Sequence, residues 1–332
     1  MKTPAFWQSP HDPRSLLLAP LGWLWCAVAR HRLNAYRAGQ RQAEHLPVPV
    51  IVIGNVTVGG SGKTPLTLWL ARRLRTAGWR PAVLSRGYGA TIEGGPRQVR
   101  GDSPASEVGD EPLLLKRRLG DDLEVIVHPR RALAGRLAIE LGADVLLLDD
   151  GLQHLALARD LEIAVLDGGR GLGNGRCLPA GPLREPETRL DAVDAVVVQG
   201  GDPGAGRWGM RLVPGMAVNL VDGSHRPLSD FGRMHCEALA GIGHPERFFA
   251  MLRGLGLSVD GHAFADHHAF SAADLAPFTA RPLLMTEKDA VKCQPHARPN
   301  HWYVPVEVEV DEGLAEFILS RLETLRDGQT PA

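Results

Sequence analysis

The sequence lacks an excess of charge of either sign. Its 332 residues include 37 Lys and Arg against 38 Asp and Glu, for a formal net charge of −1. This argues against a dedicated nucleic-acid binder, because such proteins usually carry a basic excess. With 44% hydrophobic and 23% charged residues, the composition excludes a disordered chain, a collagen-like repeat and a polytopic membrane protein. The length predicts about two domains.

The sequence also lacks a cysteine or zinc-ligand pattern. Its four cysteines, Cys26, Cys177, Cys236 and Cys293, lie far apart and form no CxxC pair, and its 13 histidines show no spacing such as HExxH. We therefore expect reduced thiols of a cytosolic protein, incidental or structural in role. Glycine (38 residues) and proline (25 residues) are abundant instead, which is typical of a protein with many functional loops.

No apolar run is long enough for a comfortable membrane span. The uncharged run of residues 16–29 has 14 residues, or about 21 Å as a helix, against about 30 Å of hydrocarbon. It contains Trp23 and Trp25 and is followed by basic residues from Arg30 to Arg41. This combination is typical of a helix docked at a membrane interface.

Two alternatives exist for this N-terminal region. Ala27-Val28-Ala29 resembles the cleavage site of a signal peptide, and the helix could instead be buried on a domain. We favour interfacial attachment of residues 1–43. These residues hold six basic residues and one acid, a local charge of +5, so the remainder carries −6. A basic, tryptophan-bearing segment suits an anionic membrane surface.

The rest of the chain reads as two α/β domains. Residues 44–205 alternate short apolar runs with helical patterns such as residues 131–141, which predicts a parallel sheet. After about residue 205 the pattern changes to a smaller α/β domain, residues 206–332, with a strand pair in residues 210–221 and a closing helix at residues 314–325. The runs predicted as strands of the first domain are residues 48–53, 82–84, 125–127, 145–148, 163–166 and 195–198.

A phosphate-binding loop follows the first of these strands. It reads Thr57-Val58-Gly59-Gly60-Ser61-Gly62-Lys63-Thr64, between a strand and a helix expected to begin near Thr64, as the P-loop pattern requires. Backbone N–H groups of such a loop converge on phosphate oxygens. Lys63 is expected to contact the β- and γ-phosphates, and the Thr64 hydroxyl to ligate Mg²⁺.

The loop departs from two related patterns. Thr57 replaces the glycine that usually begins a P-loop. Val58 stands where dimerising ATPases of the cell-division and arsenite-pump type carry a lysine, which weighs against that class.

Acidic residues supply candidates for the metal and for proton transfer. Asp149 and Asp150 end an apolar strand, which is where a Walker B acid is presented to Mg²⁺, although a plain Asp-Gly turn is the simpler interpretation. Asp110 lies in a Gly-Asp-Glu-Pro string that alone indicates a helix start. Asp266-His267-His268 alone is a polar loop. An Asp–His pair brought together across the two domains would make a general base for an alcohol.

Taken together, the motifs resemble those of the tetraacyldisaccharide 4′-kinases, lipid A pathway enzymes of Gram-negative bacteria. They occur in order over most of the chain, which is far more specific than an isolated P-loop. The matching strings are VGGSGKTP at 58–65, LSRGYG at 84–89, GDEP at 109–112, LLLDDGLQH at 146–154, GNGRCLPAGPLREP at 173–186, AGIGHPERFF at 240–249, DHHAF at 266–270 and TEKDAVK at 286–292.

The resemblance implies a kinase that uses ATP and Mg²⁺. Its acceptor is the 4′-hydroxyl of a tetraacylated glucosamine disaccharide 1-phosphate, and its product is lipid IVA. The family fold is two α/β domains joined by a β linker, with the active site in the cleft, and a membrane-associated N-terminal helix. The implied location is the cytoplasmic face of the inner membrane, peripheral or monotopic. Lipid and membrane surface are then the partners, without nucleic acid or an obligate protein partner.

The resemblance also implies roles for particular residues. Lys63 and Thr64 match the groups that hold phosphate and magnesium, and Asp149 and Asp150 match the magnesium-side acids. Asp110 matches a catalytic aspartate that works with a histidine of the DHH string, for which we choose His267 over His268.

Two further positions follow from the same strings. Glu185, in the LREP string, is expected to be a further acid of the metal site. Arg86, in the SRGYG string, is expected to reach phosphate or the 1-phosphate of the substrate.

Two other functions stay open from the residues alone. One is a membrane-associated P-loop nucleotide switch, for which Thr286-Glu287-Lys288-Asp289 superficially resembles a guanine-reading box, with its lysine one place late. The other is a soluble small-molecule kinase whose N-terminal helix is buried. A switch hydrolyses nucleotide without a sugar acceptor, whereas a kinase requires one.

Overall fold

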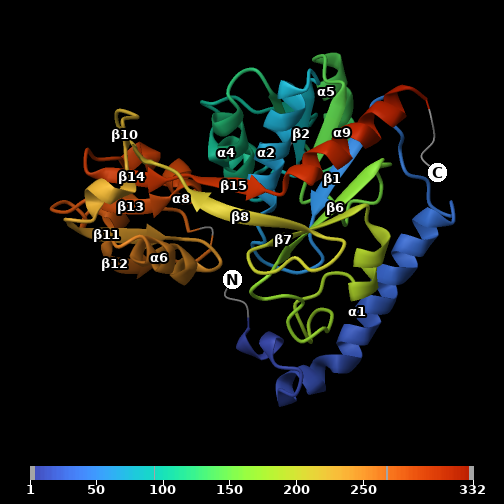
Figure 1. Ribbon diagram of the computed structural model, residues 1–332, viewed down its shortest axis with the longest axis horizontal. Coiled ribbons are helices and arrows are strands. Elements are labelled where there is room, and N and C mark those ends of the chain that lie inside the picture. The colour runs from blue at the N-terminus through green and yellow to red at the C-terminus, as the bar shows by residue number, and fades with distance from the viewer. Residues whose placement is uncertain (1–3, 93, 267, 329–332) are drawn as a thin grey trace. The chain divides into compact units, whose positions relative to one another are not determined.

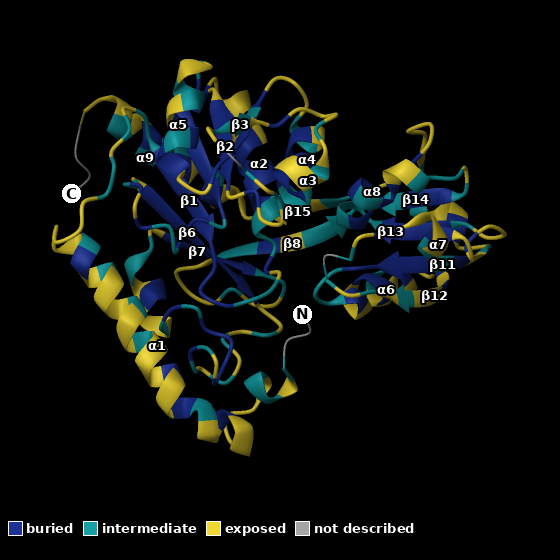
Figure 2. Ribbon diagram, turned by 180° about the vertical axis from the view of Figure 1, so that it is seen from behind, coloured by how far each residue is buried: buried dark blue, intermediate teal, exposed yellow. Residues whose placement is uncertain are grey.

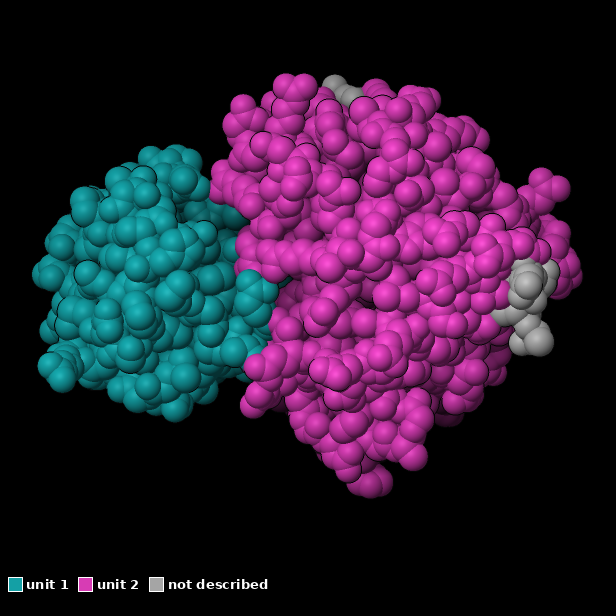
Figure 3. Space-filling model, turned by 45° about the horizontal axis from the view of Figure 1, so that its top comes forward, with its two compact units in different colours: residues 1–2, 213–307 teal, residues 3–212, 308–332 magenta. Residues whose placement is uncertain are grey.

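The computed structural model describes residues 4–92, 94–266 and 268–328. The described chain divides into two compact units (Figure 3). The larger unit is formed by residues 4–212 and 308–328, and the smaller by Val213–Glu307. Strands β8 (Trp208–Pro214) and β15 (Val306–Val310) contain the two points at which the chain passes from one unit to the other.

The larger unit is built on a nine-stranded sheet in the order β15-β8-β7-β6-β1-β5-β2-β4-β3 (Figure 1). Its central strand β1 pairs in parallel with β5 and β6. The central strands are almost uniformly apolar and buried along their length, as expected where helices cover both faces of a parallel sheet. The other bounds are β1 Val50–Gly54, β2 Pro81–Ser85, β3 Arg97–Gln98, β4 Glu124–Val127, β5 Val145–Asp149, β6 Leu161–Asp167 and β7 Ala195–Gln199.

Helices α2 and α9 pack together beside this sheet. In α2, Leu66, Leu70 and Leu74 are fully buried or nearly so, and they recur at helical spacing on one face. In α9, Leu314, Ile318 and Leu322 have no exposed surface. The helices of the larger unit, apart from the N-terminal ones, are α2 Lys63–Thr76, α3 Ala105–Val108, α4 Asp110–Leu119, α5 Arg131–Glu140, η2 Glu187–Ala192 and α9 Glu312–Arg326.

The N-terminal helix α1 (Pro13–Arg37) follows the short helix η1 (Ala5–Gln8) and has two different faces. One face is buried on the larger unit at small residues such as Ser15 and Gly22. The other exposes Leu17, Trp23 and Leu24 by 81%, 70% and 62% (Figure 2). Among the described residues, no helix has the length and apolar character needed to cross a membrane. The predicted N-terminal helix is therefore present.

The smaller unit is a six-stranded sheet in the order β10-β9-β14-β13-β11-β12. Large apolar side chains such as Phe231, Phe249 and Leu252 fill its core. The bounds are β9 Ala217–Asn219, β10 His225–Arg226, η3 Leu228–Phe231, β11 His235–Ala240, α6 Pro245–Gly254, β12 Ser258–Ala263, α7 Ala272–Leu275, β13 Leu283–Thr286, α8 Glu287–Cys293, η4 Gln294–His296 and β14 His301–Val304.

The α/β class with a parallel core is confirmed, but three details differ from the sequence prediction. Residues 210–221 do not form a strand pair, because β8 joins the nine-stranded sheet whereas β9 pairs with β10 and β14. Residues 308–328, predicted as part of the second domain, belong to the larger unit, since the buried face of α9 packs there. Helix α2 begins at Lys63, one residue before its predicted start.

The expectation of four reduced thiols is wrong for one pair. Cys26 of α1 and Cys177 form a disulfide, with their Cα atoms 5.9 Å apart, whereas Cys236 and Cys293 are free and buried. The pair is separated by 151 residues in sequence. The two cysteines meet because α1 lies along the loop that follows β6. No local sequence pattern predicts such a contact.

Candidate active site

The P-loop lies between the end of β1 and the first turn of α2. Gly59 and Gly62 adopt the left-handed backbone with φ of +101° and +90°, a conformation that glycine adopts without steric cost. The buried side chain of Asn55 donates from Nδ2 to the Gly59 carbonyl and to Ser61 Oγ, both at 3.2 Å. The loop is thus held open at a helix N-terminus, the arrangement that binds phosphate.

All eight predicted residues, Thr57 to Thr64, lie in this loop and the helical turn after it. Thr57 is buried and forms a β-bridge with Leu183, and the Val58 N–H donates to the Pro182 carbonyl at 2.9 Å. The two residues that depart from related patterns therefore pair with a distant segment of the chain. Gly60 and Gly62 remain at the turn itself.

The two predicted acids at the end of β5 face the first turn of α2. Lys63 Nζ lies 3.7 Å from Asp150 Oδ1. Thr64 Oγ1 donates to Asp149 Oδ2 at 3.4 Å. Thr67 Oγ1, which the sequence analysis missed, donates to Asp149 Oδ1 at 3.1 Å. Thr67 lies one helical turn after Thr64, and that spacing is the only local signal for it.

Asp149 and Asp150 differ sharply in their electrostatic surroundings. Burial, together with the negative charges of Glu111 and Asp150, raises the pKa of Asp149 to about 7 against the opposing effects of Lys63 and of the Thr67 hydrogen bond. Burial also disfavours the charged form of Asp150, but Lys63 and Arg184 outweigh it and leave its pKa lowered. Asp150 therefore has its counter-ions within the chain, whereas the surroundings of Asp149 disfavour its charged form.

Asp110 is the first residue of α4, after Gly109, which has φ of +93°. A Cβ at Gly109 would lie 2.8 Å from the Tyr88 carbonyl, so only glycine allows this helix start. Glu111, the next residue, acts electrostatically on Asp149. Glu111 has no role predicted from the sequence.

The histidines of the DHH string lie in the smaller unit. His268 Nε2 lies 3.3 Å from Asp274 Oδ2, so this ring has a local carboxylate partner. His267, the predicted catalytic histidine, lies outside the described residues.

Glu185 is buried and held by its neighbours. It accepts from Gln153 Nε2 at 2.9 Å, lies 3.8 Å from Arg189 Nε, and burial raises its pKa. Among the described residues, no three His, Cys, Asp or Glu side chains converge as a metal-binding group. In the described part of the chain, Glu185 therefore does not form a metal-binding cluster with Asp149 and Asp150. Its carboxylate contacts Gln153 and Arg189 instead.

Arg184, the residue before Glu185, reaches the acids directly. Its guanidinium donates to both carboxylate oxygens of Asp150, at 3.0 and 3.1 Å. Arg184 has no predicted role of its own and is named above only as part of the LREP string. A single arginine in a loop carries no local signal that it contacts an acid 34 positions earlier.

A basic neighbourhood lies close to these acids. Arg86 is exposed, as expected of a residue that reaches for an anion. Burial, together with the positive charge of Arg86, lowers the pKa of Arg131 to about 10. Burial likewise lowers the pKa of His154 to about 4, together with Arg131, Arg159, Arg32 and Arg86. Positive charges from several elements, α1 included, therefore gather around His154.

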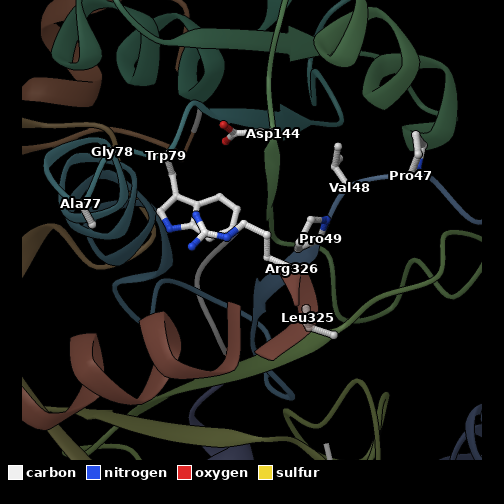
Figure 4. A pocket seen from close by; sticks show the side chains of 9 residues that line it. All are labelled: Pro47, Val48, Pro49, Ala77, Gly78, Trp79, Asp144, Leu325 and Arg326. Carbon is white, nitrogen blue, oxygen red and sulfur yellow. The ribbon is translucent and has the colours of Figure 1, made fainter. Parts of the chain in front are cut away.

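A cavity of about 370 Å³ lies elsewhere, near the start of β1 (Figure 4). It is lined by Pro49, Trp79 and Arg326 among others, and the Arg326 guanidinium lies 5.5 Å from the centroid of the Trp79 ring. The P-loop follows the opposite end of β1. Since parallel α/β sheets bind ligands at the carboxyl ends of their strands, this cavity is not the candidate site.

Comparisons with known proteins identify the family. The model of the family "Tetraacyldisaccharide-1-P 4′-kinase" matches residues 14–323. The chain belongs to this family. It is 48% identical to the tetraacyldisaccharide 4′-kinase of Nitrosococcus oceani over 96% of this chain and 93% of that protein. It is 47% identical to the enzyme of Pseudomonas aeruginosa over 97% of each chain.

A solved structure agrees with this assignment. The crystal structure of LpxK from Aquifex aeolicus in complex with ATP has a TM-score of 0.80 and 31% identity, over 93% of this chain and 99% of that one. The chain is therefore a kinase with the fold of an ATP-binding member of its family. Membership sets aside the nucleotide-switch alternative and confirms the resemblance on which the predicted roles rest.

Proposed function

We propose that this kinase transfers the γ-phosphoryl group of ATP to the 4′-hydroxyl of tetraacyldisaccharide 1-phosphate at a membrane surface. The observation that carries the proposal is the convergence of Lys63, Thr64, Asp149 and Asp150 at the P-loop. In the reaction, the acceptor oxygen forms a bond to Pγ as the bond from Pγ to the β-phosphate oxygen breaks, and ADP leaves. Catalysis of this kind depends mainly on positioning and charge neutralisation.

The P-loop and Lys63 hold the phosphates in this proposal. The loop amides at the start of α2 face the anionic groups, and Lys63 is pre-positioned by Asp150. When bound, Mg²⁺ would neutralise negative charge on the transferring phosphate. Asp149 and the Thr64 hydroxyl are the groups that fit it, because Mg²⁺ is usually bound by one or two carboxylates together with substrate phosphates. The raised pKa of Asp149 supports this choice.

Asp110 is the proposed general base for the acceptor. Its place in the first turn of α4, next to Glu111 whose charge acts on Asp149, supports a position near the reacting groups. Asp110 accepts the proton that leaves the 4′-hydroxyl, and His267 remains the histidine predicted to assist it. Glu185 supports the site by holding Gln153, and Arg86 contributes positive charge toward a substrate phosphate.

The proposed membrane partner is the anionic surface that holds the lipid. The exposed Leu17, Trp23 and Leu24 on α1, together with basic residues at its end such as Arg37, support peripheral docking. The cytoplasmic face of the inner membrane is the proposed location, because ATP is supplied there. The acyl chains stay in the bilayer while the head group enters the site.

The test is transfer of label from γ-labelled ATP to purified tetraacyldisaccharide 1-phosphate in mixed micelles, with identification of the product. The expected result is a lipid 1,4′-bisphosphate that forms only when the acceptor is present. Release of labelled phosphate without labelled lipid would contradict the proposal and restore the nucleotide switch. Equal transfer to a water-soluble sugar would instead favour the small-molecule kinase.

A further inference from the structure

The loop of residues 173–186 connects α1 with the phosphate site. It follows β6 and ends with Arg184 and Glu185, the two residues that contact the acids and Gln153. In Figure 1, α1 (blue) and this yellow-green loop lie side by side. One end of the loop contacts α1, and the other contacts the P-loop and Asp150.

At one end, α1 is fitted closely to the loop. The buried Ser15 Oγ donates to the Ala180 carbonyl at 2.7 Å and accepts from Asn174 Nδ2 at 2.8 Å. A Cβ at Gly22 would lie only 2.9 Å from the Cys177 carbonyl oxygen, so the helix backbone approaches the loop as closely as glycine allows. The Cys26–Cys177 disulfide joins the two elements covalently.

At the other end, the loop is bonded to the P-loop and to Asp150. The Arg184 N–H donates to the Val56 carbonyl at 2.7 Å. The Arg184 guanidinium holds both oxygens of Asp150, which in turn pairs with Lys63 at 3.7 Å. Asp150 has φ of +52°, an uncommon backbone conformation for a residue with a side chain, and Arg184 and Lys63 are the cations that hold its side chain.

The link between the two ends is Trp25. Its Nε1 donates to the Arg184 carbonyl at 2.9 Å. The neighbouring Trp23 is 70% exposed and its indole has no hydrogen bond within the described chain. An indole that serves only as an interfacial anchor keeps its polar group for the lipid–water boundary. Trp25 is itself 47% exposed, but it uses that group on the backbone carbonyl of the residue that holds Asp150.

We propose that Trp25 is a positioning residue for phosphoryl transfer. By fixing the backbone of Arg184, it keeps the guanidinium on Asp150 and hence Lys63 in place for the γ-phosphate. The inference rests on the proposed function. It gives α1 a second role, because the helix that docks on the membrane also aligns the phosphate site.

The test compares Trp25→Phe with Trp23→Phe in the full-length enzyme. Each change removes one indole N–H and keeps an aromatic ring. Trp25→Phe is expected to lower kcat about three- to tenfold, the effect of one neutral hydrogen bond, with the KM for lipid within about twofold of wild type. Trp23→Phe is expected to act on the KM for lipid and on vesicle co-sedimentation rather than on kcat.

A double-mutant cycle with Arg184→Lys tests the route of the effect. If Trp25 acts through Arg184, Trp25→Phe should add less than about twofold to the loss already caused by Arg184→Lys. If Trp25→Phe does not fold, Cys26→Ala, which removes the neighbouring covalent link, is expected to show the same split of kcat from KM.

Two results would overturn the inference. One is that both tryptophan variants change KM and co-sedimentation alike with kcat intact. The other is that the two losses in the cycle multiply in full. Failure of the wild-type enzyme to phosphorylate the lipid would instead contradict the proposed function, so the two failures are distinguishable.

Discussion

Each unit of this protein buries an aspartate beside a helix that follows a parallel strand. The two aspartates differ in the groups that contact their carboxylates. Asp289 in the smaller unit has no exposed surface and accepts from Lys292 Nζ at 3.2 Å, from the Gly241 N–H at 2.9 Å and from Thr286 Oγ1 at 2.6 Å. Asp149 in the larger unit accepts hydrogen bonds from the hydroxyls of Thr64 and Thr67. One carboxylate is paired with a lysine at hydrogen-bond distance, and the other is contacted by two hydroxyl groups.

This difference separates structural from catalytic use of the same chemistry. A buried carboxylate with a buried lysine partner stabilises a fold only as an intact pair. A buried carboxylate without a cation destabilises the fold unless it is protonated or gains one. We therefore expect substitutions near Asp149, at the carboxyl end of β5, to remove activity. Substitutions near Asp289 should lower the stability of the fold.

The largest expected effect is on catalysis in the larger unit, at Asp110 in the first turn of α4. Asp110→Ala should lower kcat by about 10²–10⁴-fold, the usual worth of general-base catalysis, while the affinity for ATP stays near wild type. Steady-state kinetics and nucleotide binding by calorimetry check this. Collapse of ATP binding would place Asp110 in the nucleotide site and remove its assignment as the base.

The next effect is on stability in the smaller unit. Asp289→Ala leaves Lys292 buried without its carboxylate, which should cost about 3–5 kcal/mol of unfolding free energy. Urea unfolding of the full chain measures this. The matched control is Asp289→Asn with Lys292→Met, which removes both charges and should recover much of the loss. Equal destabilisation by the control would show that the charge pair is not the cause.

Asp149→Asn should have the opposite effect on stability. Because the folded-state pKa of Asp149 is raised to about 7, its contribution to stability is lost as pH rises from the unfolded value toward 7. At about 1.4 kcal/mol per pH unit, the loss reaches up to about 4 kcal/mol at pH 8. The variant without ligands should therefore be more stable than wild type at pH 8, by more than at pH 5, and inactive. A variant less stable than wild type at pH 8 would contradict the conclusion that the charged form of Asp149 destabilises the fold without a bound ligand.

The smallest expected effect is at the outer face of α1. Leu17 is 81% exposed, so Leu17→Glu should leave the fold and kcat intact while raising the KM for lipid several-fold through weaker docking. Vesicle co-sedimentation and kinetics in mixed micelles check this, with Leu17→Phe as the apolar control. Unchanged partitioning of Leu17→Glu would remove α1 from the membrane account.

Local patterns predicted much of the larger unit. The strands of its parallel sheet are short, almost wholly apolar runs, and the P-loop glycines mark the β1–α2 junction, so the fold and Lys63, Thr64, Asp149 and Asp150 follow from neighbouring residues. Contacts between distant segments could not be predicted in this way. The Cys26–Cys177 bridge and the Arg184–Asp150 pair arise because the loop after β6 folds back between α1 and the P-loop. The exchange of β8 and β9 between two sheets also depends on tertiary packing, because the strand period does not specify a partner.

The central claim is that the edge holding Lys63 and Asp149 performs phosphoryl transfer. The most direct measurement is label transfer from ATP to tetraacyldisaccharide 1-phosphate by Lys63→Ala, beside wild type and at equal folded concentration verified by thermal unfolding. The account predicts that wild type forms the labelled bisphosphate and that Lys63→Ala forms none above background. Product formation by the variant at the wild-type rate would contradict it.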